Sequence, residues 1–390
     1  MMTAFRLTTI TLLLAVFSNS AATLYVSLGS TNPTPPYTNW ATAATNIQDA
    51  IEASADGDLI LVTYFGNGAG GGADSAVLIG CVLSNNLSYY GGGVENSTLY
   101  NCTLTGNLTF IDGDYTANGG GASGCTLTDC IISGNSSLTG AGASGSTLVN
   151  CTVVHNSAND TGGGVNSCTL ANCIVYFNTA LKGTNYSDDS SLSYCDTTPL
   201  PASGFGNVTN DPAFVRLADD DFHQQANSPC INAGNNAYVT STSDLDGNPR
   251  IVSGTVDIGA YEYQGTGSVI SYAWLQQYGL PTDGSADFID SDGDGMNNWQ
   301  EWICGTCPTN AQSGLRLGSA TPAGTNITVT WHSVAGVNYF LERSTNLASP
   351  FMHLASFIMG QAGTTSYADT NAGGAGQVFY RMGVLPSGAN

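Results

Sequence analysis

The chain has 390 residues, a formal net charge of −22, and only 9% charged residues. Its seven lysines and arginines are too few to form a phosphate-binding surface, which excludes nucleic acid as a partner. No apolar run of about 18 residues follows the first 22 residues, so we do not expect the protein to span a membrane.

Residues 1–22 have the pattern of a secretory signal peptide. Arg6 precedes an apolar stretch from Leu7 to Phe17, and small residues suited to cleavage follow that stretch. The stretch is too short to serve as a spanning helix. We therefore expect a protein that is secreted or held at the cell surface.

Residues 37–62 predict a short helix followed by a strand. Ala44, Ile47, Ala50 and Ile51 fall on one face of that helix, and the strand covers 59–62. A helix in this position would cap the open end of the core that the following repeats build.

A glycine-rich segment recurs five times between residues 70 and 178. The copies are GGGADSAVLIGCVLSNN from 70, GGGVENSTLYNCTLTGN from 91, GGGASGCTLTDCIISGN from 119, GAGASGSTLVNCTVVHN from 140 and GGGVNSCTLANCIVYFN from 162. Aligned without gaps, they form a leucine column (Leu78, Leu99, Leu127, Leu148, Leu170), a cysteine column (Cys81, Cys102, Cys130, Cys151, Cys173), an aliphatic column (Leu83, Leu104, Ile132, Val153, Val175) and an asparagine column (Asn86, Asn107, Asn135, Asn156, Asn178).

The spacing within a copy favours strands over a helix. The cysteine and aliphatic columns are two residues apart, which is strand alternation, and the leucine column lies three residues earlier, across a bend. We expect two short strands with a corner in each copy. A unit of about 21 residues cannot bury its own apolar face, so the copies must stack as a parallel β-helix.

The columns then have distinct roles in the stack. Leucine, cysteine and the aliphatic residues fill the interior. Asparagine is expected to take up left-handed backbone at a turn and to form hydrogen bonds along the axis. The eleven cysteines do not predict a disulfide framework, because column cysteines point the same way on successive coils. Cys304 and Cys307 are the one pair that we expect could join.

One interval between copies is 28 residues and not about 21, which indicates an inserted loop after Asn107. The loop holds two aromatic and two acidic residues, Phe110, Asp112, Asp114 and Tyr115. Carboxylates beside aromatic rings suit a sugar ring or a cation, so these four residues form a candidate ligand-binding loop. The alternative is a solvated loop without a ligand.

Residues 206–264 carry the motifs DPAFV, DFHQQANSPCINAG, DLDGNPRI and VDIGAYEYQ. These motifs resemble the terminal signature of exported bacterial right-handed β-helix proteins with a pectate-lyase-like fold, and residues 25–53 resemble their opening segment. The repeats are similar to those of polymorphic outer-membrane proteins. The resemblance covers 23–264 and implies a right-handed parallel β-helix over that range.

Residues 268–313 contain a twelve-position acidic loop. Its expected ligands are Asp290, Asp292, Asp294, the backbone carbonyl of Met296, Asn298 and Glu301, with Gly295 at the sharp turn. This spacing predicts a structural Ca²⁺ site, and the segment resembles thrombospondin type 3 and dockerin calcium loops. Asp283 and Asp287 are candidates for a second, weaker site.

Residues 314–390 alternate between apolar and polar positions with turns between the runs, which predicts a small antiparallel β-sandwich. The segment resembles fibronectin type III-like modules. The whole chain is thus predicted to be all-β: a signal peptide (1–22), a right-handed parallel β-helix with a capping helix (23–264), a calcium-loop linker (268–313) and a β-sandwich (314–390).

The coils from 59 to 205 contain one lysine, Lys182, and one histidine, His155. Four acidic residues of these coils (Asp74, Glu95, Asp129, Asp160) are expected not to share a column, so we predict no facing pair of carboxylates and no catalytic residue. This favours a non-catalytic protein that binds an extracellular glycan or a cell-surface protein. The alternative is a polysaccharide lyase or glycoside hydrolase.

Overall fold

The computed structural model describes residues 22–27, 29–54, 59–63, 70–110, 117–372 and 376–384. The chain divides into two compact units, 1–62 and 63–390. The predicted signal peptide lies outside the described residues except for its last residue. Among the helices of the described residues, none is long and apolar enough to cross a membrane.

The first unit contains the helix that the sequence predicts. Strand β1 (Thr23–Ser27) is followed by the short 3₁₀ helix η1 (Trp40–Thr42), helix α1 (Ile47–Ala53) and strand β2 (Leu59–Thr63). The Ser27 N–H donates to the Ala44 carbonyl at 2.8 Å, and the Ala44 N–H donates to the Tyr25 carbonyl at 2.8 Å. These bonds hold Ala44, which precedes α1, beside β1. The capping role of α1 stays a prediction.

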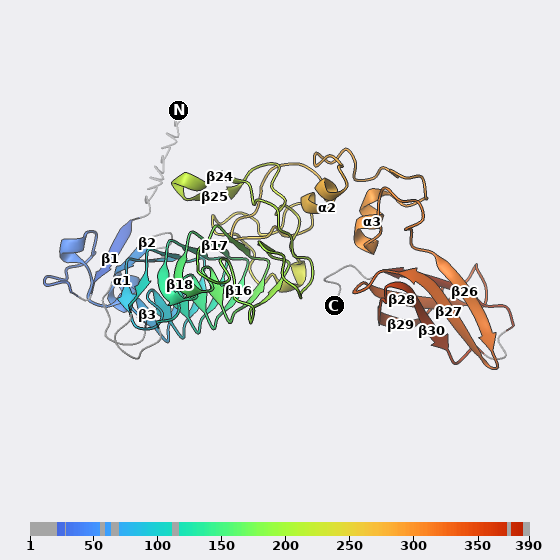
Figure 1. The fold of residues 1–390 in the computed structure, drawn as a ribbon, viewed down its shortest axis with the longest axis horizontal. Helices are drawn as coiled ribbons and strands as arrows, with labels where there is room; N and C mark the ends of the chain where they lie inside the picture. Colours follow the sequence, from blue (N-terminus) through green and yellow to red (C-terminus); the bar gives the residue numbers. More distant parts are fainter. Residues whose placement is uncertain are drawn as a thin grey trace, which may run out of the picture. The chain divides into compact units, whose positions relative to one another are not determined.

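The repeats of the second unit form a parallel β-solenoid (Figure 1). Its first four coils have four short strands each, and the fifth copy has three. The first sheet is β3 (Ala73–Asp74), β7 (Val94–Glu95), β11 (Ala122–Ser123), β15 (Ala143–Ser144) and β19 (Val165–Asn166). The second is β4 (Val77–Ile79), β8 (Thr98–Tyr100), β12 (Thr126–Thr128), β16 (Thr147–Val149), β20 (Thr169–Ala171) and β22 (Ser191–Ser193). In the third lie β5 (Cys81–Ser84), β9 (Thr103–Thr105), β13 (Ile131–Ser133), β17 (Thr152–Val154), β21 (Ile174–Tyr176) and β23 (Asp196–Thr197). The fourth is β6 (Leu87–Ser88), β10 (Leu108–Thr109), β14 (Ser136–Thr139) and β18 (Ser157–Thr161).

The prediction of two strands per copy was therefore too low. The additional strands are two to five residues long and lie in the glycine-rich start of each copy and just after its asparagine. Strands this short, with glycines between them, leave too little alternation to be recognised from the sequence.

The leucine and aliphatic columns stack as predicted. Leu99 pairs in register with Leu78 and Leu127, and Ile132 pairs with Leu104 and Val153. Every member of the two columns is buried. The leucine column continues beyond the five copies at Leu192, which pairs with Leu170.

The cysteines are all free thiols, as the column geometry predicts. The Cys102 N–H donates to Cys130 Sγ in the next coil at 3.4 Å, and Cys102 Sγ donates to the Tyr100 carbonyl at 3.2 Å. Cys304 and Cys307, the pair that the sequence suggested could join, are also free thiols. A second column, which the sequence reading missed, alternates serine and cysteine: Ser97, Cys125, Ser146 and Cys168.

The asparagines form a continuous buried hydrogen-bond ladder. In Asn135, for example, the backbone N–H and the side-chain Nδ2 both donate to Asn156 Oδ1 at 2.9 Å. Nδ2 of Asn135 also donates to the Leu104 carbonyl at 2.9 Å. The expectation of left-handed backbone at these asparagines was wrong. The left-handed residue is the one before each of them: Asn85, Gly106, Gly134, His155 and Phe177.

Residues 206–264, called here the covering segment, fold back along the outside of the third sheet. They include β24 (Phe214–Arg216), the 3₁₀ helices η2 (Leu217–Asp219) and η3 (Asn236–Tyr238), and β25 (Asp221–Gln224). Three outward-facing apolar residues of the coils, Ile131, Val154 and Ile174, are buried in one cluster with residues of this segment. The residues from the segment are Phe214, Phe222, Cys230, Ile258 and Ala260. The motifs at 206–264 thus provide the second apolar layer of the solenoid.

Gly259 shows how closely the covering segment approaches the coils. Its N–H donates to the Asn172 carbonyl at 2.9 Å, and its φ is +112°. A Cβ at this position would lie 2.8 Å from Ile174 Cδ1. Only glycine combines this backbone conformation with contact at this distance.

Arg250 joins the covering segment to the coils through a buried network. Its side chain is 1% exposed, and Nη1 lies 3.5 Å from Asp129 Oδ1 of the coils while Nη2 lies 3.2 Å from Glu262 Oε2. Nη1 also donates to the Ala260 carbonyl at 2.9 Å, and Nη2 to the Tyr261 carbonyl at 3.1 Å. A buried guanidinium is tolerated here because opposite charges and carbonyls surround it.

The C-terminal part contains two helices and two antiparallel sheets. The helices are α2 (Tyr272–Gln277) and α3 (Asn298–Cys304). One sheet is β26 (Leu317–Ala323), β27 (Asn326–Ser333) and β30 (Gly363–Asp369), and the other is β29 (Met352–Met359), β28 (Asn338–Ser344) and β31 (Phe379–Val384). Both sheets contribute to one buried cluster, Val329, Trp331, Tyr339 and Leu341. The fibronectin type III resemblance stays a prediction.

Candidate functional site

The acidic loop at 290–301 brings its first three carboxylates together. Asp290, Asp292 and Asp294 each present an oxygen within 4.8 Å of the others. Backbone N–H groups of Gly293 and Gly295 donate to the two oxygens of Asp290, at 2.8 and 3.0 Å. Gly295 has a φ of +100°, so the sharp turn predicted at position 6 is present.

Four oxygens of the predicted ligand set are buried and accept no hydrogen bond: Asp292 Oδ2, Asp294 Oδ2, Asn298 Oδ1 and Glu301 Oε2. The amide of Asn298 is oriented by its other atom, because Nδ2 donates to the Ala286 carbonyl at 2.8 Å and leaves Oδ1 free. Buried acceptors without a donor are rare in folded proteins because they cost free energy. A cation bound among these oxygens would remove that cost.

Helix α3 places Glu301 at the end of the loop. Asn297 caps the helix in a capping box with Gln300, which fixes the helix start directly after the acidic turn. Glu301 is fully buried. Burial and the charges of Asp292 and Asp294 raise the pKa of the Glu301 carboxyl to about 7. The unmetallated loop is therefore an electrostatically unfavourable arrangement that a divalent cation would relieve.

Met296 is position 7 of the twelve-position loop, where the backbone carbonyl is the predicted ligand. Its backbone N–H donates to Asp294 Oδ1 at 2.9 Å, so the chain turns back toward the carboxylates at this residue. The donor set comprises carboxylate, amide and backbone carbonyl oxygens without nitrogen or sulfur, and this set fits Ca²⁺.

The second, weaker site suggested for Asp283 and Asp287 is not formed by these residues. Both oxygens of Asp287 are used within the fold, since Oδ1 accepts from Ser268 Oγ and Oδ2 accepts from the Val269 N–H at 2.9 Å. Asp283 is exposed and accepts from the Ser285 N–H at 2.9 Å. Asp287 therefore has a structural role, because it connects residues 268 and 269 to the residues just before the acidic loop.

The candidate ligand-binding loop falls largely outside the described residues. Asp112, Asp114 and Tyr115 are among those not described. Phe110 is described, and its ring lies against that of Tyr89 with centroids 4.1 Å apart. A ligand at this loop stays a prediction.

The expectation that no two coil carboxylates share a column was wrong. Asp74 on β3 and Glu95 on β7 are direct partners in the first sheet. Burial, followed by the charge of Asp74, raises the pKa of the Glu95 carboxyl. The ungapped repeat alignment already placed both residues four positions after the first glycine of their copies, so the sequence carried this signal.

Among the described coil residues, the other ionisable side chains discussed above form no comparable pair. Asp129 is buried beside Arg250, and the exposed Lys182 lies 3.7 Å from Asp160. His155 is exposed, with Nδ1 3.6 Å from Asp220 Oδ1. These contacts are explained by packing and surface charge pairing.

Asp196 is a buried carboxyl that faces the covering segment. Cys230 Sγ donates to Asp196 Oδ2 at 3.1 Å, and burial raises the pKa of the Asp196 carboxyl to about 8. The residue is fully buried, so a substrate has no access to it.

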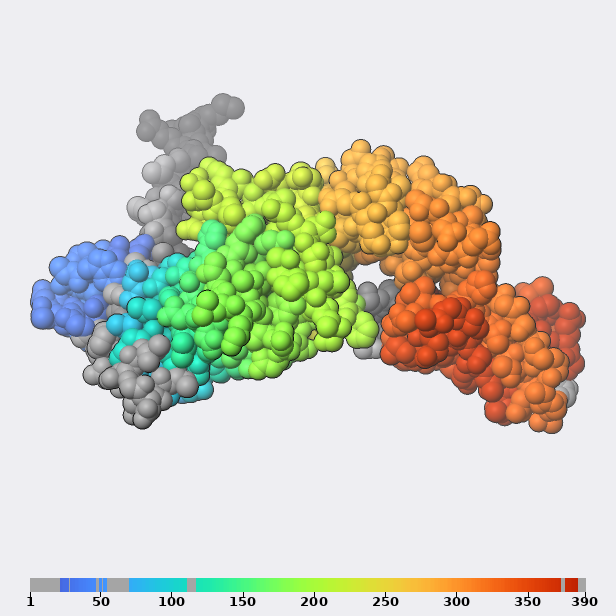
Figure 2. Space-filling model, viewed as in Figure 1, coloured from blue at the N-terminus to red at the C-terminus, as the bar shows by residue number. Residues whose placement is uncertain are grey.

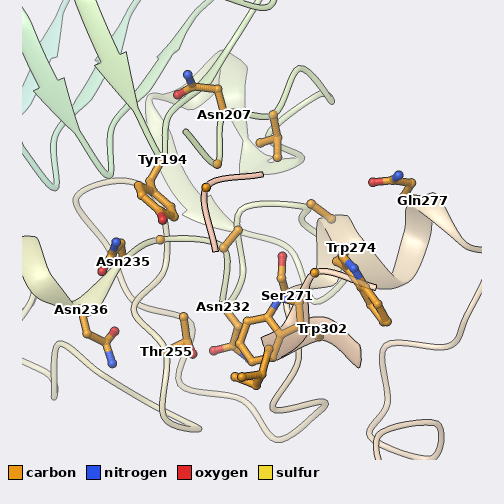
Figure 3. Close-up of a pocket in the computed structure, with 18 of the residues that line it drawn as sticks. Tyr194, Asn207, Asn232, Asn235, Asn236, Thr255, Ser271, Trp274, Gln277 and Trp302 are labelled. Carbon is orange, nitrogen blue, oxygen red and sulfur yellow. The ribbon is translucent and has the colours of Figure 1, made fainter. Parts of the chain in front are cut away.

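A hollow between the end of the solenoid and α2 is lined by aromatic and amide side chains (Figure 3). Tyr194, Trp274 and Trp302 line it, and none of its described lining residues is an aspartate, glutamate, histidine, lysine or arginine. Two of the amides are used within the fold: Asn207 accepts from the Cys195 N–H, and Asn236 donates to the Gly254 carbonyl at 2.8 Å. The described lining of the hollow therefore provides no acid–base pair.

On the face shown in Figure 2 the coils, coloured cyan to green, form a continuous surface without a deep cleft. In the second sheet, one outward row consists of hydroxyl residues in direct register: Thr98, Thr126, Thr147, Thr169 and Ser191. All but Thr98, which is half-buried, are exposed.

No model of a known protein family matches the sequence, and no curated protein matches it. Among solved structures, the crystal structure of pectate lyase Pel9A is 12% identical, with a TM-score of 0.28, and the match covers 63% of this chain and 97% of that chain. A TM-score this low does not support a common function. The solenoid assignment rests on the strand pairing itself.

Proposed function

We propose that the protein is an exported, non-catalytic right-handed β-helix protein that binds glycans or other surface partners and holds a structural Ca²⁺ ion. The observation that carries the binding role is the row of in-register hydroxyl side chains along the second sheet, from Thr98 to Ser191. Its members repeat at the strand spacing of about 4.8 Å. A regular row of hydroxyls without charge suits many weak, identical contacts to a repeating neutral polymer.

The binding proposal is tested on a glycan array, with calcium and with chelator. The double variant Thr126→Lys/Thr147→Lys places two long charged side chains in the row and is expected to abolish retention of any glycan that the wild type binds. Thr364→Lys, at an exposed position of β30, serves as the control and is expected to bind normally. Equal retention by the double variant would remove the row as the site, and no retention by the wild type would remove the glycan proposal.

The Ca²⁺ proposal is supported by the four buried oxygens without a donor in the acidic loop. In a calcium-loaded protein, Asp290, Asp292, Asp294, Asn298 and Glu301 would hold the ion with side-chain oxygens, and Met296 with its carbonyl. The bound ion would supply positive charge that holds the loop closed against α3.

Calcium is expected to raise the melting temperature of the purified protein and to protect residues 283–310 from proteolysis. Asp292→Ala removes a central carboxylate and is expected to abolish both effects. Asp188→Ala, at an exposed position of the solenoid, removes the same charge and is expected to leave both effects intact. Cleavage at the same rate in calcium and in chelator would contradict the proposal.

Glycoside hydrolysis is a second candidate function, which the Asp74 and Glu95 pair favours. Two neighbouring carboxyls, one with a raised pKa, are what a glycosidase uses as acid and nucleophile or base. The assay is release of reducing sugar from the glycans that the array retains. Turnover that disappears in Glu95→Gln would replace the binding proposal with this one.

A further inference from the structure

Residues 311–316, called here the strap, lie across the acidic loop just before β26. The Leu315 N–H donates to Met296 Sδ at 3.3 Å, and Arg316 Nη2 donates back to the Ala311 carbonyl at 2.7 Å. At Gly314 the approach is so close that a Cβ would lie 2.1 Å from Asp294 Oδ2. The strap therefore covers one of the predicted ligand oxygens.

Arg316 places a positively charged guanidinium near that same oxygen. Its Nη2 lies 3.5 Å from Asp294 Oδ2, which accepts no hydrogen bond. The Asp294 side chain is 1% exposed, whereas that of Arg316 is 44% exposed. The carboxylate is thus held in place, while the guanidinium has open solvent into which it can withdraw.

We propose that Arg316 is a built-in competitor of calcium at Asp294, which lowers the affinity of the loop and leaves the oxygen when the ion binds. This inference rests on the proposed calcium site. Without the ion, Arg316 offsets part of the repulsion among the loop carboxylates. With the ion present, two positive charges face one carboxylate, and the exposed guanidinium is the one that moves.

The expected effect is large enough to measure. A dipositive ion and a guanidinium held about 6 Å apart repel each other, even in the dielectric of water, by an amount equivalent to roughly tenfold in affinity. Because the guanidinium can withdraw into solvent, this repulsion sets the upper limit of the effect. Arg316→Gln removes the charge and retains a polar side chain of moderate length. We expect this variant to bind calcium more tightly than the wild type, by up to about tenfold.

The test is calorimetric titration of the purified protein with calcium chloride after chelator treatment. Arg316→Lys retains the charge and is expected to stay within about threefold of the wild type. Arg381→Gln is the matched control, because this exposed arginine is paired with Glu342 on the sandwich. It removes the same charge and is expected to change the affinity less than twofold.

A second measurement separates competition from a merely structural role. In chelator, Arg316→Gln is expected to melt at a lower temperature than the wild type, because the carboxylates lose their counter-charge. In saturating calcium the variant is expected to gain more in melting temperature than the wild type gains. A variant with unchanged or weaker affinity overturns the inference, whereas a wild type that binds no calcium overturns the proposed site itself.

Discussion

Arg250→Ala is expected to destabilise the solenoid by about 3–5 kcal/mol, the range for breaking a buried ion pair by removing one partner. The substitution leaves Glu262 and Asp129 as buried carboxyls without the Arg250 charge, and the Ala260 and Tyr261 carbonyls each lose a hydrogen bond from Arg250. It also removes one link between the covering segment and the coils, since Asp129 belongs to the coils and Glu262 to the covering segment. Urea unfolding followed by tyrosine and tryptophan fluorescence measures the loss.

Arg216 provides the control for this experiment. Its side chain is 66% exposed and pairs with Asp221 at 3.2 Å. Surface pairs of this kind contribute about 0–1 kcal/mol, so Arg216→Ala is expected to lie in that range. Arg250→Lys is expected to fall between the two, because it keeps the charge and loses the planar fork. A cost below about 1 kcal/mol for Arg250→Ala would show that the network does not hold the covering segment.

Asn156→Ala is expected to cost about 4 kcal/mol or more, since it interrupts the asparagine ladder in the middle of the stack. Asn156 Oδ1 accepts from both the N–H and Nδ2 of Asn135 at 2.9 Å, and its Nδ2 donates to the Ile132 carbonyl and to Asn178 Oδ1 at 2.9 Å. Each buried partner left without its hydrogen bond costs about 1–3 kcal/mol. Equilibrium unfolding in urea provides the number.

Two further variants define what the ladder requires. Asn156→Asp keeps the oxygen that Asn135 needs but loses the donors, so it is expected to be destabilising as well. Asn210→Ala, at an exposed position of the covering segment, is expected to change stability by less than about 0.5 kcal/mol. If Asn156→Ala lost no more stability than Asn210→Ala, the ladder would be a by-product of stacking and not a cause of it.

The solenoid could be predicted from the sequence because its determinants repeat. Columns such as Leu99 with Leu127 and Asn107 with Asn135 show the same residue at the same offset, and stacking turns that offset into register. The acidic loop was predictable for a similar reason, since all of its ligand positions fall within twelve consecutive residues. Local spacing carries the information in both cases.

The features that the sequence reading missed depend on distant partners. Arg250 looks like an ordinary polar residue until Asp129, 121 positions earlier, is placed beside it. Ile131 and Ile174 alternate as outward residues of strands, and nothing local shows that Phe222 covers them. The pairing of Asp74 with Glu95 is different, because the repeat alignment contained it and the reading overlooked it.

The coil register has a consequence for how this architecture changes over evolutionary time. Because Thr126 and Leu127 occupy the same columns as Thr169 and Leu170, excision of the intervening copy would join two surfaces that already match. Each copy is therefore a unit that duplication or deletion can add or remove as a whole, and the reach of the solenoid can lengthen or shorten without a new interior being invented.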